Sequence, residues 1–137
     1  MQTHLGHIQF NVQPANIAFY RDLLSLLGWK MIHDTPEMLG AEGEHGSSLW
    51  FAGQVKAGVN YDYDGPGLNH FAFGTAAQAD VDTAATQLTA KGITLLFETP
   101  RHRPEFSMSA EDTYYQIMFE SPDKILFEIV YTGTKDA

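Results

Sequence analysis

The chain has 137 residues and a formal net charge of −9, from 8 lysines and arginines against 17 aspartates and glutamates. This length fits one compact domain, and a hydrophobic fraction of 44% is enough to build a core. Nucleic acid and anionic membrane surfaces are excluded as expected partners, because both require positive charge. The absence of cysteine excludes disulfides and thiolate sites. With neither a signal-peptide pattern nor a long apolar run, we expect a cytoplasmic protein.

Two parts of the chain resemble each other. The segments Leu5–Phe10 and Leu68–Phe73 each carry a histidine in a strand-like pattern. A polar break, a helix-like stretch and a glycine follow each segment, at Gly28 and near Gly92. The repeat predicts two modules, about residues 3–63 and 68–132, which fold together as a single domain over residues 1–137.

Apolar spacing predicts one helix in each module. Apolar residues recur at intervals of three and four over Ile17–Leu27, and again within Gln78–Ala90. Alternating or apolar runs predict strands at Gly6–Val12, Trp29–His33, Ser47–Ala52, Asn69–Thr75, Ile93–Phe97, Tyr114–Phe119 and Lys124–Tyr131.

Three segments are predicted to be irregular. Asp62–Gly67 is typical of a linker between modules, and Ser121–Lys124 of a tight turn. Glu98–Asp112 is long for a connection, and such loops are often lids or binding loops. Each module therefore reads βαβββ. The expected fold class is α+β, in which two tandem βαβββ modules form a mixed, curved sheet around a cleft, with the helices on the outer face.

Strand alternation places three residues that can bind metal on the face of the sheet away from the helices. His7 lies opposite the apolar side of its strand, His70 occupies the equivalent position of the repeat, and Glu128 interrupts a strongly apolar strand. An acid in such a strand is costly unless it is paired or binds a cation. Two histidines and one carboxylate can form a metal site with open coordination positions. The alternatives are surface or structural histidines and a salt-bridged Glu128.

Several motifs carry a resemblance to a known family. They are His7–Val12, Ala18–Leu24 leading into Leu27–Trp29, Leu68–Phe73 and the hairpin Ser121–Glu128. On these motifs the chain resembles the vicinal oxygen chelate superfamily, which includes glyoxalase I, bleomycin-resistance proteins and extradiol dioxygenases. The resemblance implies that His7, His70 and Glu128 are ligands of a divalent metal, which would be Zn, Ni, Mn or Fe(II).

The resemblance also implies a function. We expect an isomerase, lyase or dioxygenase that acts on a small substrate chelating the metal through vicinal oxygens. Ser47–Ala52 has no carboxylate where glyoxalase I has a fourth ligand, so the three-ligand set is more similar to that of fosfomycin-resistance enzymes and extradiol dioxygenases. The alternative is a metal-free protein, similar to bleomycin-resistance proteins, that sequesters a small cationic ligand. A homodimer is implied, whose modules pair within one chain or exchange between two.

Other residues are candidates for binding or catalysis. Arg101 and Arg103 belong to the one local basic cluster and could bind an anionic substrate, and Trp50 could line the substrate pocket. His102 and either Tyr114 or Tyr115 are candidate catalytic residues, since the two tyrosines lie on opposite faces of one strand.

Overall fold

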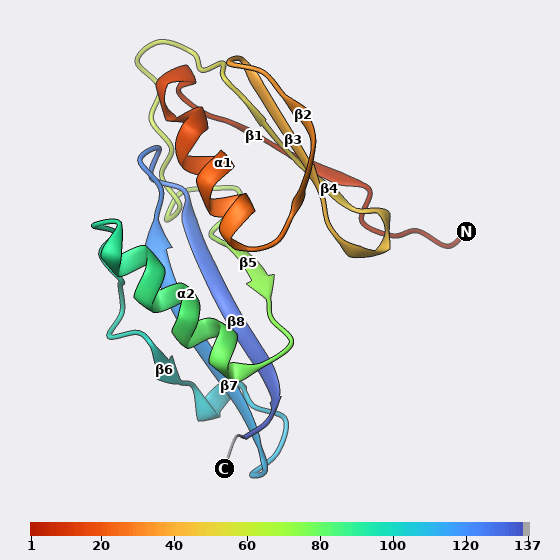
Figure 1. Ribbon diagram of the computed structural model, residues 1–137, viewed down its shortest axis with the longest axis vertical. Helices are drawn as coiled ribbons and strands as arrows, with labels where there is room; N and C mark the ends of the chain where they lie inside the picture. The colour runs from red at the N-terminus through yellow and green to blue at the C-terminus, as the bar shows by residue number, and fades with distance from the viewer. Residues whose placement is uncertain (136–137) are drawn as a thin grey trace. The chain divides into compact units, whose positions relative to one another are not determined.

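The protein folds into two compact units. The computed structural model describes residues 1–135, in which one unit is Met1–Asn60 and the second begins at Tyr61. Each unit has one α-helix packed on one face of a four-stranded mixed sheet (Figure 1). This arrangement confirms the predicted α+β class and the two βαβββ modules, each of which forms its own sheet. None of the helices in the described part of the chain has the length and apolar character needed to cross a membrane.

The first unit is built around the sheet β1-β4-β3-β2. Its elements are β1 (His7–Asn11), η1 (Pro14–Asn16), α1 (Ile17–Leu26), β2 (Lys30–Asp34), β3 (Met38–Glu42), η2 (Glu44–Gly46) and β4 (Ser48–Ala52). Strand β1 runs parallel to β4, and the other pairs are antiparallel. Parallel strands need a long crossover connection. Here α1 is part of the connection from β1 to β4, and it therefore lies on one face of the sheet.

The core of the first unit lies between α1 and its sheet. Tyr20 and Phe51 are fully buried with ring centroids 4.5 Å apart, and Phe10 stacks on Phe51 at 4.9 Å. Phe10 is buried while His7 and Asn11 of the same strand are exposed, so the predicted alternation of β1 is confirmed.

The second unit is built around the sheet β5-β8-β7-β6. Its elements are β5 (Phe71–Gly74), α2 (Gln78–Ala90), β6 (Arg101–His102), η3 (Pro104–Phe106), β7 (Asp112–Glu120) and β8 (Leu126–Thr134). Strands β7 and β8 form a long antiparallel hairpin, and β5 pairs with β8 in parallel. Helix α2 lies against β7 and β8 on one face of this sheet, and the opposite face carries no α-helix of this unit (Figure 1).

One predicted strand is wrong. Ile93–Phe97 is not extended, because Phe97 and the following Glu98 have φ angles of 57° and 60°, in the left-handed region. The second strand of this module is instead the short β6, inside the stretch predicted to be a loop. The alternation analysis also missed β3, whose central Gly40 interrupts the apolar pattern.

Gly40 is needed because an indole ring lies across it. Gly40 is paired with Trp50 on β4, and a Cβ atom built on Gly40 would lie 2.5 Å from Trp50 Cζ3. We expect Gly40→Ala to lower the free energy of unfolding by about 1–3 kcal/mol, because the ring must move or the backbone must shift. Urea unfolding followed by tryptophan fluorescence measures this loss, since both tryptophans belong to the first unit.

Gly6→Ala is the matched control. A Cβ atom at Gly6 would meet no atom within 4 Å, and its φ is not in the left-handed region. We expect a change within about 0.5 kcal/mol, as for other surface substitutions. Equal effects of the two substitutions would contradict the close approach of Trp50 to Gly40.

Candidate metal centre

Glu128 is a buried carboxylate in the middle of an apolar strand. Its neighbours Phe127 and Ile129 face α2, so Glu128 projects from the opposite face of the sheet. It is only 2% exposed. A carboxylate so far from water must be compensated by hydrogen bonds or positive charge.

Two residues of β7 bind the carboxylate of Glu128. The Tyr114 hydroxyl donates a hydrogen bond of 2.8 Å to Oε1, and the Gln116 side-chain amide donates to Oε2. Tyr114 and Gln116 are two residues apart and therefore share a face of the sheet. Burial and the nearby Glu128 carboxylate raise the pKa of Tyr114, so its hydroxyl remains a neutral donor. Both donors to Glu128 are thus uncharged.

His70 supplies a nitrogen beside the same carboxylate. It directly precedes β5, and its Nε2 lies 3.9 Å from Glu128 Oε1. Its Nδ1 lies 2.8 Å from Asn69 Oδ1, an acceptor, because the Asn69 amide nitrogen donates to the Tyr63 carbonyl oxygen. In the neutral imidazole the proton is then on Nδ1, and Nε2 carries the lone pair. A ligand histidine in proteins is commonly oriented in this way.

The predicted metal triad draws on both units. His70 and Glu128 belong to the second unit, whereas His7 is exposed at the start of β1 in the first. His7 is on the face of its sheet that also carries Gln9 and Trp50, away from α1. Within either unit, over residues 1–135, no group of three or more histidine, aspartate and glutamate side chains lies close enough to hold an ion.

Trp50 is partly exposed on that same face of the first unit. Its indole nitrogen donates a hydrogen bond of 3.0 Å to the Ser48 hydroxyl, and its ring lies over Gly40. His33 approaches the ring with centroids 6.0 Å apart. The indole is therefore held in one orientation.

Arg103 is connected to the carboxylate of Glu128 through the side chain of Gln116. Its Nη1 donates a hydrogen bond of 3.1 Å to Gln116 Oε1, and its Nε donates to Glu105 at 2.5 Å. The hydrogen bond from Arg103 lowers the pKa of Glu105. The guanidinium carbon lies 4.9 Å from the ring centre of Phe106, and that ring contacts Tyr114 at 5.4 Å.

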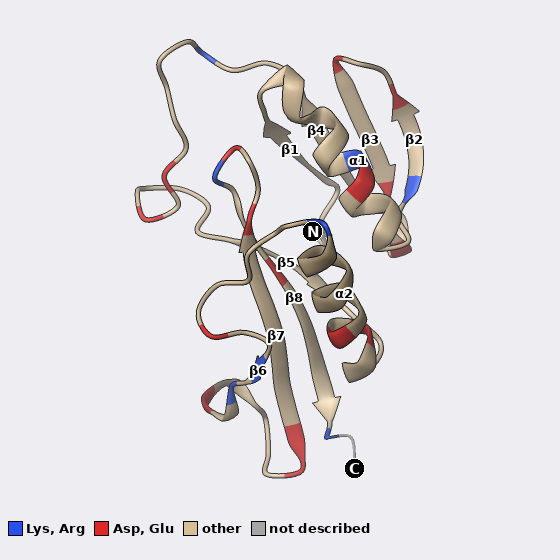
Figure 2. Ribbon diagram, turned by 60° about the vertical axis from the view of Figure 1, so that its left-hand side comes forward, with Lys and Arg blue, Asp and Glu red and all other residues tan. Residues whose placement is uncertain are grey.

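Arg101 is directed differently from Arg103. It is paired with Gln116 across β6 and β7, and its guanidinium lies 3.6 Å from Glu98. Arg101 in β6 and Arg103 directly after it place two positive charges on this segment of the second unit (Figure 2). Of the two, Arg103 is the one connected to the Glu128 network by a hydrogen bond.

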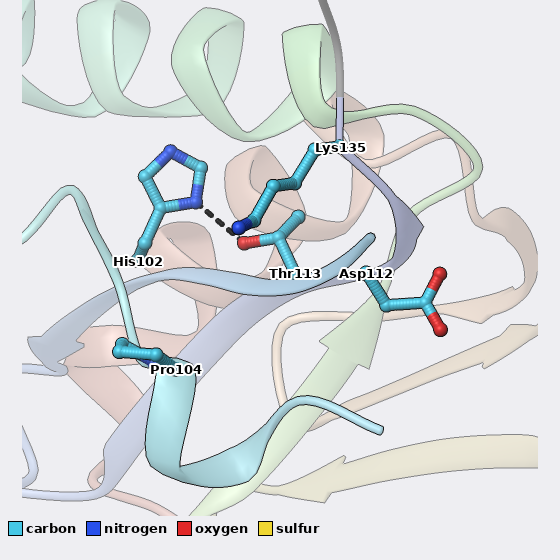
Figure 3. A pocket seen from close by; sticks show the side chains of 5 residues that line it. All are labelled: His102, Pro104, Asp112, Thr113 and Lys135. Carbon is cyan, nitrogen blue, oxygen red and sulfur yellow. Dashed lines mark hydrogen bonds between the residues drawn. The ribbon is translucent and has the colours of Figure 1, made fainter. Parts of the chain in front are cut away.

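The structure places His102 and Tyr115 on the helix face of the sheet, opposite Glu128. The Tyr115 hydroxyl donates to Asp82 of α2 at 2.5 Å, and burial together with this bond raises the pKa of Tyr115 to about 12. His102 Nδ1 lies 2.5 Å from the Thr113 hydroxyl. Figure 3 shows the His102 ring directed at Thr113 in a pocket, with the Asp112 carboxylate turned away from it.

Of the candidate catalytic residues, only Tyr114 lies beside Glu128. Sequence reasoning missed Gln116, which also contacts the carboxylate. The available signal was its phase, since Gln116 shares the Tyr114 side of the predicted strand.

Residues 4–129 match the family described as the Glyoxalase/Bleomycin resistance protein/Dioxygenase superfamily. The chain belongs to this superfamily. Among solved structures it is similar to a candidate glyoxalase from Bacillus halodurans, with a TM-score of 0.77 and 27% identity over 95% of this chain and 96% of that one. The superfamily assignment predicted from the sequence motifs is confirmed.

Two further superfamily comparisons bear on the fold and the sequence. The fosfomycin resistance protein FosX from Listeria monocytogenes, solved with Mn(II) and sulfate, has a TM-score of 0.66 and 19% identity, over 96% of this chain and 91% of that one. An uncharacterized protein of Bacillus subtilis, YqjT, is 36% identical over 64 residues. That match spans 47% of this chain and 46% of YqjT, less than half of the relative's length.

Proposed function

We propose that this superfamily member is a divalent-metal-dependent enzyme acting on a small substrate that chelates the metal through vicinal oxygens. The proposed ligands are His7, His70 and Glu128. The observation that carries the proposal is the pair within the second unit, where His70 Nε2 lies 3.9 Å from a carboxylate that is 2% exposed.

The surroundings of Glu128 fit a cation. Its two hydrogen-bond donors are neutral, and within 4.0 Å the one potentially cationic group among residues 1–135 is His70. Two neutral donors compensate a buried negative charge only in part. A divalent ion between Glu128 and a neutral imidazole would supply the missing charge, and carboxylate and imidazole are ligands that Zn, Ni, Mn and Fe(II) accept. The Mn(II) found with the FosX relative supports this group of metals.

Neighbouring side chains have proposed roles around that ion. When bound, the metal would act as a Lewis acid that stabilises negative charge on substrate oxygens, as in lyase, isomerase or dioxygenase chemistry. Tyr114 holds Glu128 Oε1 as a neutral donor. Arg103 would attract an anionic group of the substrate, and Trp50 is a proposed substrate-binding residue.

The proposal predicts which histidines matter for metal affinity. Isothermal titration of the metal-free protein with Zn²⁺, Ni²⁺ and Mn²⁺ should give at least one stoichiometric site. We expect His70→Ala to weaken that site by more than about 100-fold, beyond the 10–100-fold range for residues that only support a ligand. His102→Ala is the matched control, because His102 lies on the other face of the same sheet.

The metal-free alternative predicts a different result. A protein that sequesters a cationic ligand would bind no metal at stoichiometry, and His70→Ala would leave its ligand affinity intact. Failure of the wild-type chain to bind any of these ions would therefore reject the metalloenzyme.

Mixing His7→Ala chains with Glu128→Gln chains tests whether metal sites form between two copies of the chain. A metal site with all three native ligands reappears in mixed dimers only if the modules exchange.

A further inference from the structure

Gln116 connects two charged groups across the free face of the second sheet. Its side chain is buried, and the residue is 2% exposed in β7. The amide nitrogen donates to Glu128 Oε2, and the amide oxygen accepts a hydrogen bond of 3.1 Å from Arg103 Nη1. One amide therefore lies between a carboxylate and a guanidinium.

These two partners determine the orientation of the Gln116 amide. A carboxylate only accepts hydrogen bonds and a guanidinium only donates them, so the reversed amide would face acceptor to acceptor and donor to donor. Arg103 is itself held by the Glu105 carboxylate at 2.5 Å and by the ring of Phe106 at 4.9 Å. The Arg103 end is therefore fixed, and it keeps the amide nitrogen directed at Glu128.

The consequence is that the two oxygens of Glu128 differ. Oε2 accepts from Gln116, whereas Oε1 accepts from Tyr114 and also lies 3.9 Å from His70 Nε2. Without Gln116 only Tyr114 would hold the carboxylate, which could then turn about its last torsion, for which the preference is broad. Preventing that rotation keeps Oε1 directed toward the imidazole.

We propose that Gln116 is a positioning residue for metal binding, and that Arg103 acts through it. Together they hold the Glu128 carboxylate so that Oε1 is presented to the ion beside His70. This inference rests on the proposed function, because it requires an ion at His70 and Glu128. Residues that orient metal ligands commonly contribute 10–100-fold in metal affinity, and we expect Gln116 to fall in that range.

The test is a comparison of metal affinities on the full-length chain. Gln116→Met keeps a long unbranched side chain but has no donor for Glu128 and no acceptor for Arg103. Titration of the metal-free protein with Zn²⁺ and Mn²⁺ is expected to give a dissociation constant raised about 10–100-fold. Arg103→Met leaves the amide in place but free to turn, so a smaller increase is expected. Arg101→Met is the control and should bind metal as the wild type does, because Arg101 pairs with Glu98.

A purely structural role gives a different pattern. Thermal unfolding of the metal-free variants would show a loss of stability, while the folded protein would bind metal with wild-type affinity. Wild-type metal affinity in Gln116→Met overturns this inference but not the proposed function. If that variant does not fold, wild-type metal affinity in Arg103→Met overturns this inference. If the wild-type chain binds no metal, the proposed function fails and this inference fails with it.

Discussion

Replacing Glu128 with glutamine is expected to weaken metal binding by more than about 100-fold without weakening the metal-free fold. The substitution keeps the shape of the side chain and removes a negative charge from a position that is 2% exposed. The new amide can accept the hydrogen bond from Gln116 and donate one to the Tyr114 oxygen, so both partners stay hydrogen-bonded to residue 128. Because a neutral amide is a poor ligand for a divalent ion, we expect the dissociation constant to rise by more than about 100-fold, above the range for supporting residues.

The stability of the metal-free protein should move in the opposite direction from its metal affinity. Removing a buried charge that lacks a full counter-charge is expected to leave the free energy of unfolding unchanged or raise it, by at most about 1–4 kcal/mol, the range for replacing a whole buried ion pair by uncharged residues. Chemical unfolding of metal-free protein, followed by circular dichroism, measures this change. Metal binding by Glu128→Gln should be weaker than that of the wild type for each metal that binds the wild type.

Glu120→Gln is the matched control for Glu128. Glu120 lies at the end of β7 and accepts a hydrogen bond of 2.8 Å from the Tyr63 hydroxyl, with Lys124 3.4 Å away. The Glu120→Gln variant should bind metal as the wild type does, because the partners of Glu120 are Tyr63 and Lys124 and not His70. If Glu128→Gln instead destabilised the metal-free protein and kept wild-type metal affinity, Glu128 would serve the fold and the proposed metal centre would be wrong.

Two features of the sequence singled out Glu128 and His70, which lie 3.9 Å apart in the structure. An acid between apolar neighbours is conspicuous in any strand, and the repeat directs attention to the residue before Phe71. Gln116 was not predicted, because its partner depends on the register between β7 and β8. In the structure Gln116 is opposite Val130 and Met118 is opposite Glu128, and alternation alone does not determine such offsets.

The same reason explains the placement of His102 and Tyr115. Alternation separates Tyr114 from Tyr115, but it does not say which of them faces the helix. The pairing of His102 with Tyr115 in β6 and β7, and the bond from Tyr115 to Asp82, settle this in favour of the helix face for both. A two-residue strand such as β6 has too few positions to show any alternation in the sequence.

Helices were predicted more accurately than strands. The predicted range of α2, Gln78–Ala90, agrees with the structure, and α1 ends at Leu26, one residue before the predicted end. Helical spacing is read over several turns, so one irregular residue changes little. Strands of five residues do not offer this redundancy, which explains why a single glycine concealed β3. The apolar run Ile93–Phe97 failed as a strand because Phe97 and Glu98 adopt left-handed φ angles, although the Leu96 N–H still donates to the Met118 carbonyl oxygen of β7.

Phe127→Ala is expected to cause the largest loss of stability among core substitutions in the second unit. Phe127 is fully buried on the helix face of β8, directly before Glu128. Its ring lies 5.8 Å from that of Phe119, 6.0 Å from that of Phe73 and 6.4 Å from that of Phe71. Truncation removes these contacts and leaves a cavity that the neighbouring rings cannot fill, so we expect a loss of about 3–5 kcal/mol.

Phe97→Ala is the matched control for that loss. It removes the same number of atoms from a ring that is 51% exposed, and we expect a change of about 0.5 kcal/mol or less. Urea unfolding followed by far-ultraviolet circular dichroism measures both variants in the metal-free state. If Phe127→Ala cost no more than Phe97→Ala, the aromatic cluster would not be the core of this unit. The sheet face that carries Glu128 would then need another source of rigidity, because β8 presents Phe127 to the core and Glu128 to the proposed metal site from adjacent positions.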